Sequence, residues 1–124
     1  ACLPSCHLLF QLYTCERALH CMIYMRSVDL CVGLPSDIVL YALLVNLIAK
    51  DFGLKAKSLT FFFGDTHVYA NHVGLFEEFQ KNSIPCPSPE LIIAEHATTL
   101  TFVPSDIEIR GCVPGPVIRY PFNA

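Results

Sequence analysis

Residues 25–37 decide how this chain folds and read Met25-Arg26-Ser27-Val28-Asp29-Leu30-Cys31-Val32-Gly33-Leu34-Pro35-Ser36-Asp37. An arginine–serine pair opens the stretch, an acid follows the arginine, and a Gly-Leu-Pro turn leads to a second acid. Long apolar runs lie on both sides. Polar groups in such surroundings need a ligand or a hydrogen-bond network. We expect the polar groups of residues 3–7 and 64–72 to be their partners.

The composition is apolar for a free-standing domain, since 53% of the 124 residues are hydrophobic and 15% are charged. This predicts a well-buried sheet and a large subunit interface in one domain or part of one. A net charge of −3 offers no basic surface to nucleic acid. The most apolar run, residues 38–49, is short for a membrane span and contains Asn46, so we expect no membrane segment.

Seven cysteines are scattered without a CxxC pair or the Cys/His spacing of a structural zinc site. His67 and His72 lack an ordered third ligand, so we predict no metal site. An odd number of scattered cysteines predicts reduced thiols and a cytoplasmic location. The chain begins at Ala1, shortly before Cys6, which suggests the C-terminal piece of a longer protein.

Five apolar runs predict strands, and they are residues 8–14, 19–24, 59–63, 91–94 and 107–109. The polar pair Glu16-Arg17 should join the first two strands into a hairpin. We expect the first strand and the aromatic third strand to be buried. Mixed strands and helices in this order predict an α+β fold with α/β-type layers.

Two helices are expected. Gly33-Leu34-Pro35 predicts a break, after which Ser36 or Asp37 caps a helix that runs to about Lys50 and stops before Gly53. Its expected buried face comprises Ile38, Tyr41, Ala42, Val45, Ile48 and Ala49.

The second helix is expected over about residues 67–80, after a turn at Gly64-Asp65-Thr66. Prolines predict a loop over residues 82–89, and Pro114-Gly115-Pro116 predicts the start of an extended tail.

Cys6, which precedes His7, is a candidate nucleophile. A thiolate attacks well where positive charge or hydrogen bonds stabilise it. Arg26 supplies that charge if the two segments lie side by side. The alternative is a buried core cysteine beside a satisfied histidine, since free cysteine is among the most buried residue types.

Arg26 and Ser27 can bind a phosphate through a guanidinium fork and a hydroxyl. Asp29 can hold a polar ligand. The alternative is a structural ion pair of Arg26 with Asp29 or Glu16.

His67 and Tyr69 are two residues apart and can donate hydrogen bonds to a sugar hydroxyl. The alternative is ordinary chemistry at a helix N-terminus, with Tyr69 half-buried.

Together these motifs resemble the C-terminal half of thymidylate synthase and its relatives, the pyrimidine nucleotide hydroxymethylases. The matching segments are Leu3-Pro4-Ser5-Cys6-His7, Arg26-Ser27-Val28-Asp29, Gly33-Leu34-Pro35, Tyr41-Ala42-Leu43-Leu44 and Gly64-Asp65-Thr66-His67-Val68-Tyr69-Ala70-Asn71-His72. The resemblance covers nearly the whole chain, and the ordered set outweighs the alternatives for each motif alone. It implies that residues 1–124 are the C-terminal part of one catalytic domain whose N-terminal half is absent.

The resemblance implies a role for each matching residue. Cys6 is the nucleophile that adds to carbon 6 of a pyrimidine nucleoside monophosphate. Arg26 binds the phosphate and activates the thiol, Ser27 is a second phosphate ligand, and Asp29 holds the folate. The remaining expected substrate contacts are His7, Gln11, Gly33 (whose backbone packs on the ring), Asp37 (the base edge), His67 and Tyr69 (the sugar 3′ hydroxyl).

The same resemblance implies the cosubstrate 5,10-methylenetetrahydrofolate, no metal, and a homodimer whose large mixed sheets pack face to face. The family's catalytic glutamate, its folate-stacking tryptophan and further phosphate arginines match no residue here, and the chain has no tryptophan. We therefore expect residues 1–124 alone to be inactive.

Asp37 occupies the position of the asparagine that matches the uracil edge in thymidylate synthases. An ionised aspartate only accepts hydrogen bonds, so it opposes the carbonyl at carbon 4 of uracil and suits the amine of cytosine. Met25 replaces a glutamine and, with Asp37, resembles the deoxycytidylate hydroxymethylases. The alternative is that Asp37 is a helix N-cap that does not touch the base.

The tail also departs from the synthases, with Gly115 between two prolines and the ending Pro121-Phe122-Asn123-Ala124. A changed lid could admit water. The expected activity is folate-dependent one-carbon transfer to carbon 5, with (deoxy)cytidylate 5-hydroxymethylase first and thymidylate synthase or dCMP methylase as alternatives. The alternative that is not an enzyme is a catalytically incomplete fragment that serves only as a dimerising module.

Overall fold

The structure is a computed structural model that describes residues 4–83, 87–111, 115 and 117–121. The chain divides into two compact units, residues 1–68 and 69–124, and each is described by itself. Some of the expected features fall outside the described residues. They are Leu3 of the first motif, positions 84–86 of the predicted loop, Pro114 and Pro116, and the ending 122–124.

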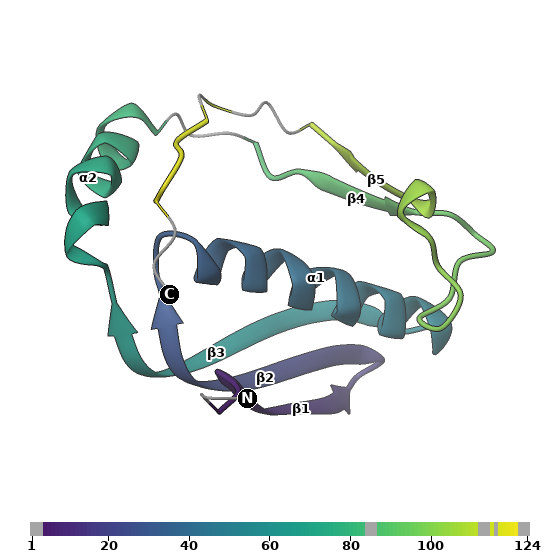
Figure 1. The fold of residues 1–124 in the computed structure, drawn as a ribbon. Helices are drawn as coiled ribbons and strands as arrows, with labels where there is room; N and C mark the ends of the chain where they lie inside the picture. The colour runs from purple at the N-terminus through teal and green to yellow at the C-terminus, as the bar shows by residue number, and fades with distance from the viewer. Residues whose placement is uncertain (1–3, 84–86, 112–114, 116, 122–124) are drawn as a thin grey trace. The chain divides into compact units, whose positions relative to one another are not determined.

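The first unit begins with an antiparallel hairpin (Figure 1). Strand β1 spans His7–Cys15 and strand β2 spans Ala18–Asp29. Glu16 and Arg17 join them with φ angles of 50° and 59°, and a tight two-residue hairpin turn requires such positive values at both positions. The predicted hairpin is confirmed, and β2 continues beyond its expected end at residue 24.

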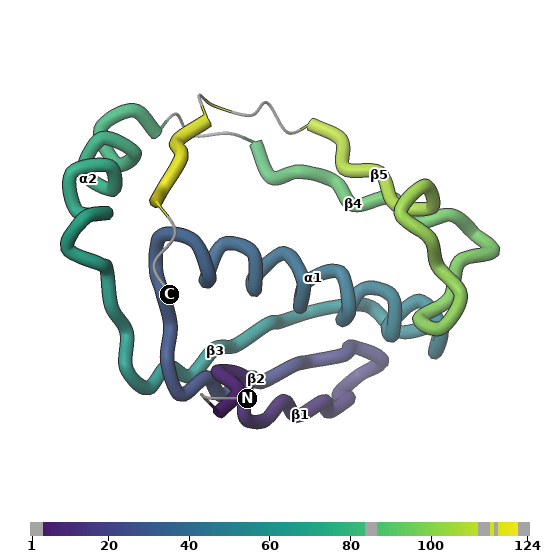
Figure 2. The backbone as a smooth tube through the Cα atoms, viewed as in Figure 1, coloured from purple at the N-terminus to yellow at the C-terminus, as the bar shows by residue number. Residues whose placement is uncertain are grey.

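Strand β2 is the centre of a three-stranded sheet with the order β1-β2-β3. Strand β3, Lys55–His67, pairs with β2 in parallel. Parallel neighbours need a crossover connection, which helix α1, Gly33–Asp51, provides. The helix lies along one face of the sheet and leads from the end of β2 back toward the start of β3 (Figure 2).

The core of this unit lies between the sheet and α1. Alternate residues of β2 from Leu19 to Met25 are buried, and α1 contributes Tyr41, Val45 and Ala49. These spacings are those of one strand face and one helix face. A fully buried large apolar side chain contributes about 1.5–3 kcal/mol. The interface between α1 and the sheet therefore supplies much of the stability of the unit.

Helix α1 begins earlier than the sequence predicts. Gly33-Leu34-Pro35 forms its first turn and is not a break before it. Pro35 is tolerated because the N–H groups of a first turn have no partner within the helix. The predicted cap is wrong, since the Ser36 hydroxyl donates to a backbone carbonyl one turn earlier and Asp37 lies inside the helix.

The end of α1 agrees better with prediction. Gly53 has a φ of +61° and its N–H donates to the carbonyl of Lys50 at 3.1 Å, so the chain turns where a glycine is favoured. The expected buried face is wrong at Ile38, which is 43% exposed, and it omits Leu47, which is buried.

Strand β3 runs through the predicted turn. Gly64-Asp65-Thr66 continues the ladder with β2, whose last pair joins Asp29 to His67. The expected turn at residues 64–66 is therefore wrong. A ladder along the central strand outweighs the local turn preference of Gly-Asp-Thr, because strand formation depends strongly on tertiary context.

Among residues 4–68, no element covers the face of the sheet opposite α1. We call it the open face, and by alternation and register it comprises Leu9, Gln11, Tyr13, His20, Met22, Tyr24, Ser58, Thr60 and Phe62. Leu9 is 63% exposed and Phe62 is 48% exposed. The expectation that β1 and the aromatic part of β3 are buried is therefore wrong for this chain.

A β-bulge interrupts β1 between His7 and Leu9. Leu9 pairs with Tyr24 of the open face, whereas His7 pairs with Met25, which is buried beneath α1. Leu8 is the extra residue. Side chains two residues apart in a regular strand share a face, so the bulge is what turns His7 toward α1.

Helix α1 is long and apolar enough to cross a membrane by length and composition alone. Core helices of globular proteins meet the same criterion. In this chain Tyr41, Val45 and Ala49 of α1 pack against the sheet.

The second unit contains helix α2, Val73–Asn82, after a 3-10 turn, Ala70–His72. The helix predicted from residue 67 therefore starts later than expected. Strands β4, Glu90–Ile93, and β5, Ile107–Arg110, pair antiparallel and confirm the two predicted late strands. A second 3-10 turn, Pro104–Asp106, precedes β5.

Gly64 is expected to tolerate no side chain. A Cβ there would lie 2.5 Å from the carbonyl oxygen of Arg26 and 3.0 Å from its carbonyl carbon, and these backbone atoms belong to the central strand. Gly64→Ala should therefore lower the free energy of unfolding by about 1–3 kcal/mol. Urea denaturation of the natural full-length polypeptide that contains residues 1–124 measures this loss.

The matched control is Gly74→Ala in the first turn of α2, where a Cβ would meet nothing within 4 Å. It should be neutral or stabilising by up to about 1 kcal/mol. Equal stability of the two variants would contradict the close approach of β2 and β3 at Gly64.

Candidate functional site

The predicted site residues of the first unit gather mainly at one end of the sheet (Figure 1). The parallel strands β2 and β3 end there, while β1 and α1 begin there. This arrangement follows from the topology, because an antiparallel strand starts where its neighbour ends.

Cys6 lies directly before β1 and beside Arg26 of β2. The N–H of Arg26 donates to the carbonyl of Cys6 at 2.9 Å. Its guanidinium donates to the carbonyls of Ser5, at 3.0 Å, and of Pro4. Nη2 of Arg26 also lies 3.8 Å from the exposed Cys6 sulfur. A cation at that distance favours attack by a thiolate.

His7 bridges β1 and α1. Its Nε2 lies 3.3 Å from Oδ1 of Asp37, and its Nδ1 lies 3.0 Å from the hydroxyl of Tyr41. The side chains of His7 and Asp37 are 34% and 18% exposed, so both remain accessible to a ligand.

Gly33 lies beside both acids of the motif. A Cβ on Gly33 would lie 3.6 Å from Cβ of Asp29 and 3.9 Å from Oδ2 of Asp37. Asp29 ends β2, and its Oδ1 accepts a hydrogen bond from the N–H of Cys31 at 2.9 Å. The structure thus brings the two acids together around a backbone position that lacks a side chain.

Ser27 and His67 lie on the neighbouring strands β2 and β3. Ser27 pairs in register with Asp65, and Asp29 pairs with His67. Nδ1 of His67 lies 3.3 Å from Oδ2 of Asp65. Tyr69 opens the second unit, where its ring meets that of His72 edge-on with centroids 5.5 Å apart.

Two residues singled out in the sequence lie elsewhere. Gln11 is on the open face, opposite Met22 of β2, whereas His7 and Asp37 lie on the α1 side. Met25 is 1% exposed and packs in the core.

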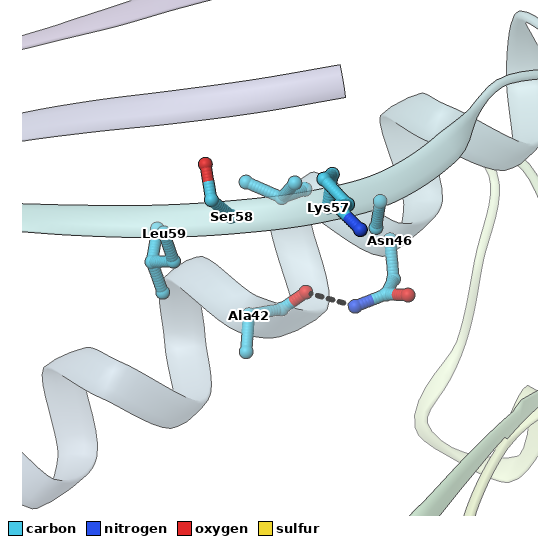
Figure 3. A pocket seen from close by; sticks show the side chains of 7 residues that line it. Ala42, Asn46, Lys57, Ser58 and Leu59 are labelled. Atoms are coloured by element: carbon cyan, nitrogen blue, oxygen red, sulfur yellow. Dashed lines mark hydrogen bonds between the residues drawn. The ribbon is translucent and has the colours of Figure 1, made fainter. Parts of the chain in front are cut away.

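Two hollows flank α1 in the first unit. One, of about 410 Å³, lies beside the site and is lined by His7, Leu8, Leu9, Phe10 and Tyr41. The other, of about 160 Å³, lies between α1 and β3 (Figure 3) and is lined by Ala42, Val45, Asn46, Ala56, Lys57, Ser58 and Leu59. No predicted site residue lines the second hollow, and the Asn46 amide there is bonded to the carbonyl of Ala42.

A family model described as Thymidylate synthase matches residues 1–124. The chain belongs to the thymidylate synthase family. The resemblance drawn from the motifs is therefore confirmed, as is the α+β thymidylate synthase-like fold.

Curated members of the thymidylate synthase family are similar to nearly the whole chain. The thymidylate synthases of Listeria monocytogenes serotype 4a and of Listeria innocua serovar 6a are each 38% identical over 122 residues, which cover 98% of this chain. The chain spans 38% of the length of these relatives.

Tyr41 is the contact at this site that sequence reasoning missed. The sequence places Tyr41 on the buried face of the helix and in one of the matching motifs, and neither observation predicts its contact with His7. Asp37 and Tyr41 are four residues apart and therefore share one helix face. That spacing is the signal that could have linked them.

The reactivity of the cysteines should follow their surroundings. Burial raises the pKa of the Cys21 thiol, and burial followed by the charge of Asp29 raises the pKa of Cys31. Both thiols are buried and form less thiolate than an exposed thiol does, so iodoacetamide should modify them more slowly than the exposed Cys6 and Cys15. Peptide mass spectrometry after timed alkylation of the natural full-length polypeptide measures each rate.

The variant Arg26→Gln tests whether the guanidinium assists the Cys6 sulfur, and Cys15 is the control. A charge about 4 Å from a sulfur in water is worth about 1 kcal/mol, so Cys6 should react about fivefold more slowly in the variant. The rate at Cys15, which is distant from Arg26 along β1, should not change. An unchanged rate at Cys6 would show that Arg26 does not assist the sulfur.

Proposed function

We propose that this chain forms the C-terminal part of a cytoplasmic enzyme that transfers a one-carbon unit from methylenetetrahydrofolate to carbon 5 of a cytosine nucleotide. The proposed activity is (deoxy)cytidylate 5-hydroxymethylase. Membership of the thymidylate synthase family supports the general chemistry.

The contact between Asp37 and His7 carries the choice of base. Oδ1 of Asp37 lies 3.3 Å from Nε2 of His7, where it can accept a histidine N–H. An ionised carboxylate accepts hydrogen bonds and cannot donate them. It would accept from the exocyclic amine of cytosine and from a proton on ring nitrogen 3. It would oppose the carbonyl at carbon 4 of uracil.

The chemistry assigned to Cys6 begins with addition of its thiolate to carbon 6 of the ring. The electron pair of the 5,6 double bond moves toward nitrogen 3, and carbon 5 becomes nucleophilic. Asp37 stabilises the proton that nitrogen 3 then carries, because preorganised groups act where charge changes. Arg26 stabilises the thiolate and, with Ser27, is the proposed phosphate ligand. When bound, the folate supplies the one-carbon unit.

Asp29 fits the proposed folate contact. One of its carboxylate oxygens accepts from the N–H of Cys31, and the second oxygen remains an acceptor for N–H donors of a pterin ring. The same acid adjoins Gly33, where the proposed ring contact lies. His67 and Tyr69 remain the proposed partners of the sugar hydroxyl, and His7, Gln11 and Gly33 remain proposed substrate contacts.

The open face supports the proposal of a homodimer. Leu9, Tyr24 and Phe62 form one row across the three strands and are exposed on it, as is Tyr13, and exposed apolar side chains that gather on one face are typical of an interface. We propose that a second copy covers it. The catalytic domain would include the part of the family's length that this chain does not span, so residues 1–124 alone should turn nothing over.

Thymidylate synthase is the second candidate, because the similar Listeria proteins carry that name. A dCMP methylase would share the cytosine contact with Asp37 and differ in the final step. A non-catalytic dimerising fragment is the candidate of another class.

Tritium release from carbon 5 tests the base assignment. The natural full-length polypeptide with methylenetetrahydrofolate should release tritium from labelled dCMP and at least ~10⁴-fold more slowly from dUMP, because the wrong hydrogen-bond polarity is rejected strongly. Asp37→Asn should shift the ratio of the two rates toward dUMP by about 100-fold or more. Release from dUMP alone would refute the argument from Asp37.

Cys6→Ser is the control for that assay. It should abolish release from both nucleotides and prevent covalent trapping of a 5-fluoropyrimidine nucleotide. Trapping by the serine variant would exclude Cys6 as the nucleophile, whichever base is used.

The fate of the folate distinguishes the two final steps. A hydroxymethylase ends by adding water to the base and leaves tetrahydrofolate, whereas a synthase or methylase transfers hydride and leaves dihydrofolate. We expect turnover of dCMP without dihydrofolate, measured by chromatography of the folates. One dihydrofolate per product would instead identify a methylating enzyme.

A further inference from the structure

Tyr41 holds the ring of His7 from within the core. The Tyr41 residue is 7% exposed, and its ring lies against Phe10 of β1 and Phe61 of β3, with centroids 6.3 Å and 6.0 Å away. Its hydroxyl emerges beside Nδ1 of His7 at 3.0 Å. The aromatic packing therefore fixes where the hydroxyl lies.

The contacts of His7 assign its tautomer. The carboxylate of Asp37 can only accept, so the Nε2 that faces it carries a hydrogen. In the Nε2–H tautomer the imidazole has an acceptor at Nδ1, which can accept from the Tyr41 hydroxyl 3.0 Å away. Burial, with the nearby charge of Asp37, raises the pKa of Tyr41, so the phenol keeps its proton at neutral pH.

We propose that Tyr41 is a positioning residue that fixes the Nε2–H form of His7 and thereby holds the Asp37 carboxylate toward the base. This inference rests on the proposed function, because it explains how the residue that reads the base is held. The bulge at Leu8 turns His7 toward α1, and the helix places Asp37 and Tyr41 on one face. A single imidazole thus connects the core to the proposed base contact.

Only the hydroxyl of the Tyr41 side chain is required to position His7. Tyr41→Phe keeps the ring contacts with Phe10 and Phe61 and removes only the donor to Nδ1. Tyr13→Phe is the matched control, because Tyr13 also stacks on a histidine, His20, with centroids 4.7 Å apart, but on the open face.

The first measurement is the ring protonation of His7, read from nitrogen-15 shifts of histidine in the natural full-length polypeptide. The parent and Tyr13→Phe should show Nε2–H alone, and Tyr41→Phe should show both tautomers. A parent with its hydrogen on Nδ1 overturns the proposal, even if no variant folds. This measurement needs no substrate, so it is independent of the proposed activity.

The second measurement is selectivity. In Tyr41→Phe the ratio of kcat/KM for dCMP over dUMP should fall about tenfold, as expected for one lost buried hydrogen bond. In the Asp37→Asn background the same change should have no effect on the ratio, because the two residues act through one path. A shifted tautomer with an unchanged ratio, or equal effects in both backgrounds, overturns the proposal. Failure of the base assignment itself would instead appear in the parent, as turnover of dUMP only.

Discussion

Arg26 is the residue on which the arrangement of the site depends. Its N–H and guanidinium bind three successive carbonyls, those of Pro4, Ser5 and Cys6, and so anchor the segment before β1 to the central strand. On the other side Gly64 of β3 lies so close to the Arg26 backbone that a Cβ would come within 2.5 Å of its carbonyl oxygen. The segment that carries Cys6 is therefore held to the central strand by one main-chain bond and by the Arg26 guanidinium.

The motif spacings predicted much of the site from the sequence. Cys6, Arg26, Asp29 and Gly33 converge because a hairpin followed by a parallel crossover returns the relevant strand ends to one edge of the sheet. The hairpin could be predicted from the apolar runs and the Glu16-Arg17 turn, whereas the parallel pairing of β2 with β3 joins segments distant in sequence and could not. The family followed from the ordered motifs.

Other features could not be predicted because they depend on partners distant in sequence. The segment 64–66 has turn residues, yet pairing with β2 keeps it extended. Asp37 is a good capping residue, yet the helix begins at Gly33 and the acid faces His7. The aromatic residues of β3 indicate a strand, but composition does not tell whether both of its faces are covered.

The bulge at Leu8 also separates the regular ladder of β1 from the segment that precedes it. Residues 9–15 follow the regular ladder of the hairpin, whereas the segment that carries Cys6 is attached mainly through Arg26. Local opening of that segment therefore breaks few bonds and leaves the core beneath α1 intact. As the proposed nucleophile, the Cys6 sulfur would have to travel between contact and bonding distance. The bulge at Leu8 would let that segment bend while the sheet stays in place.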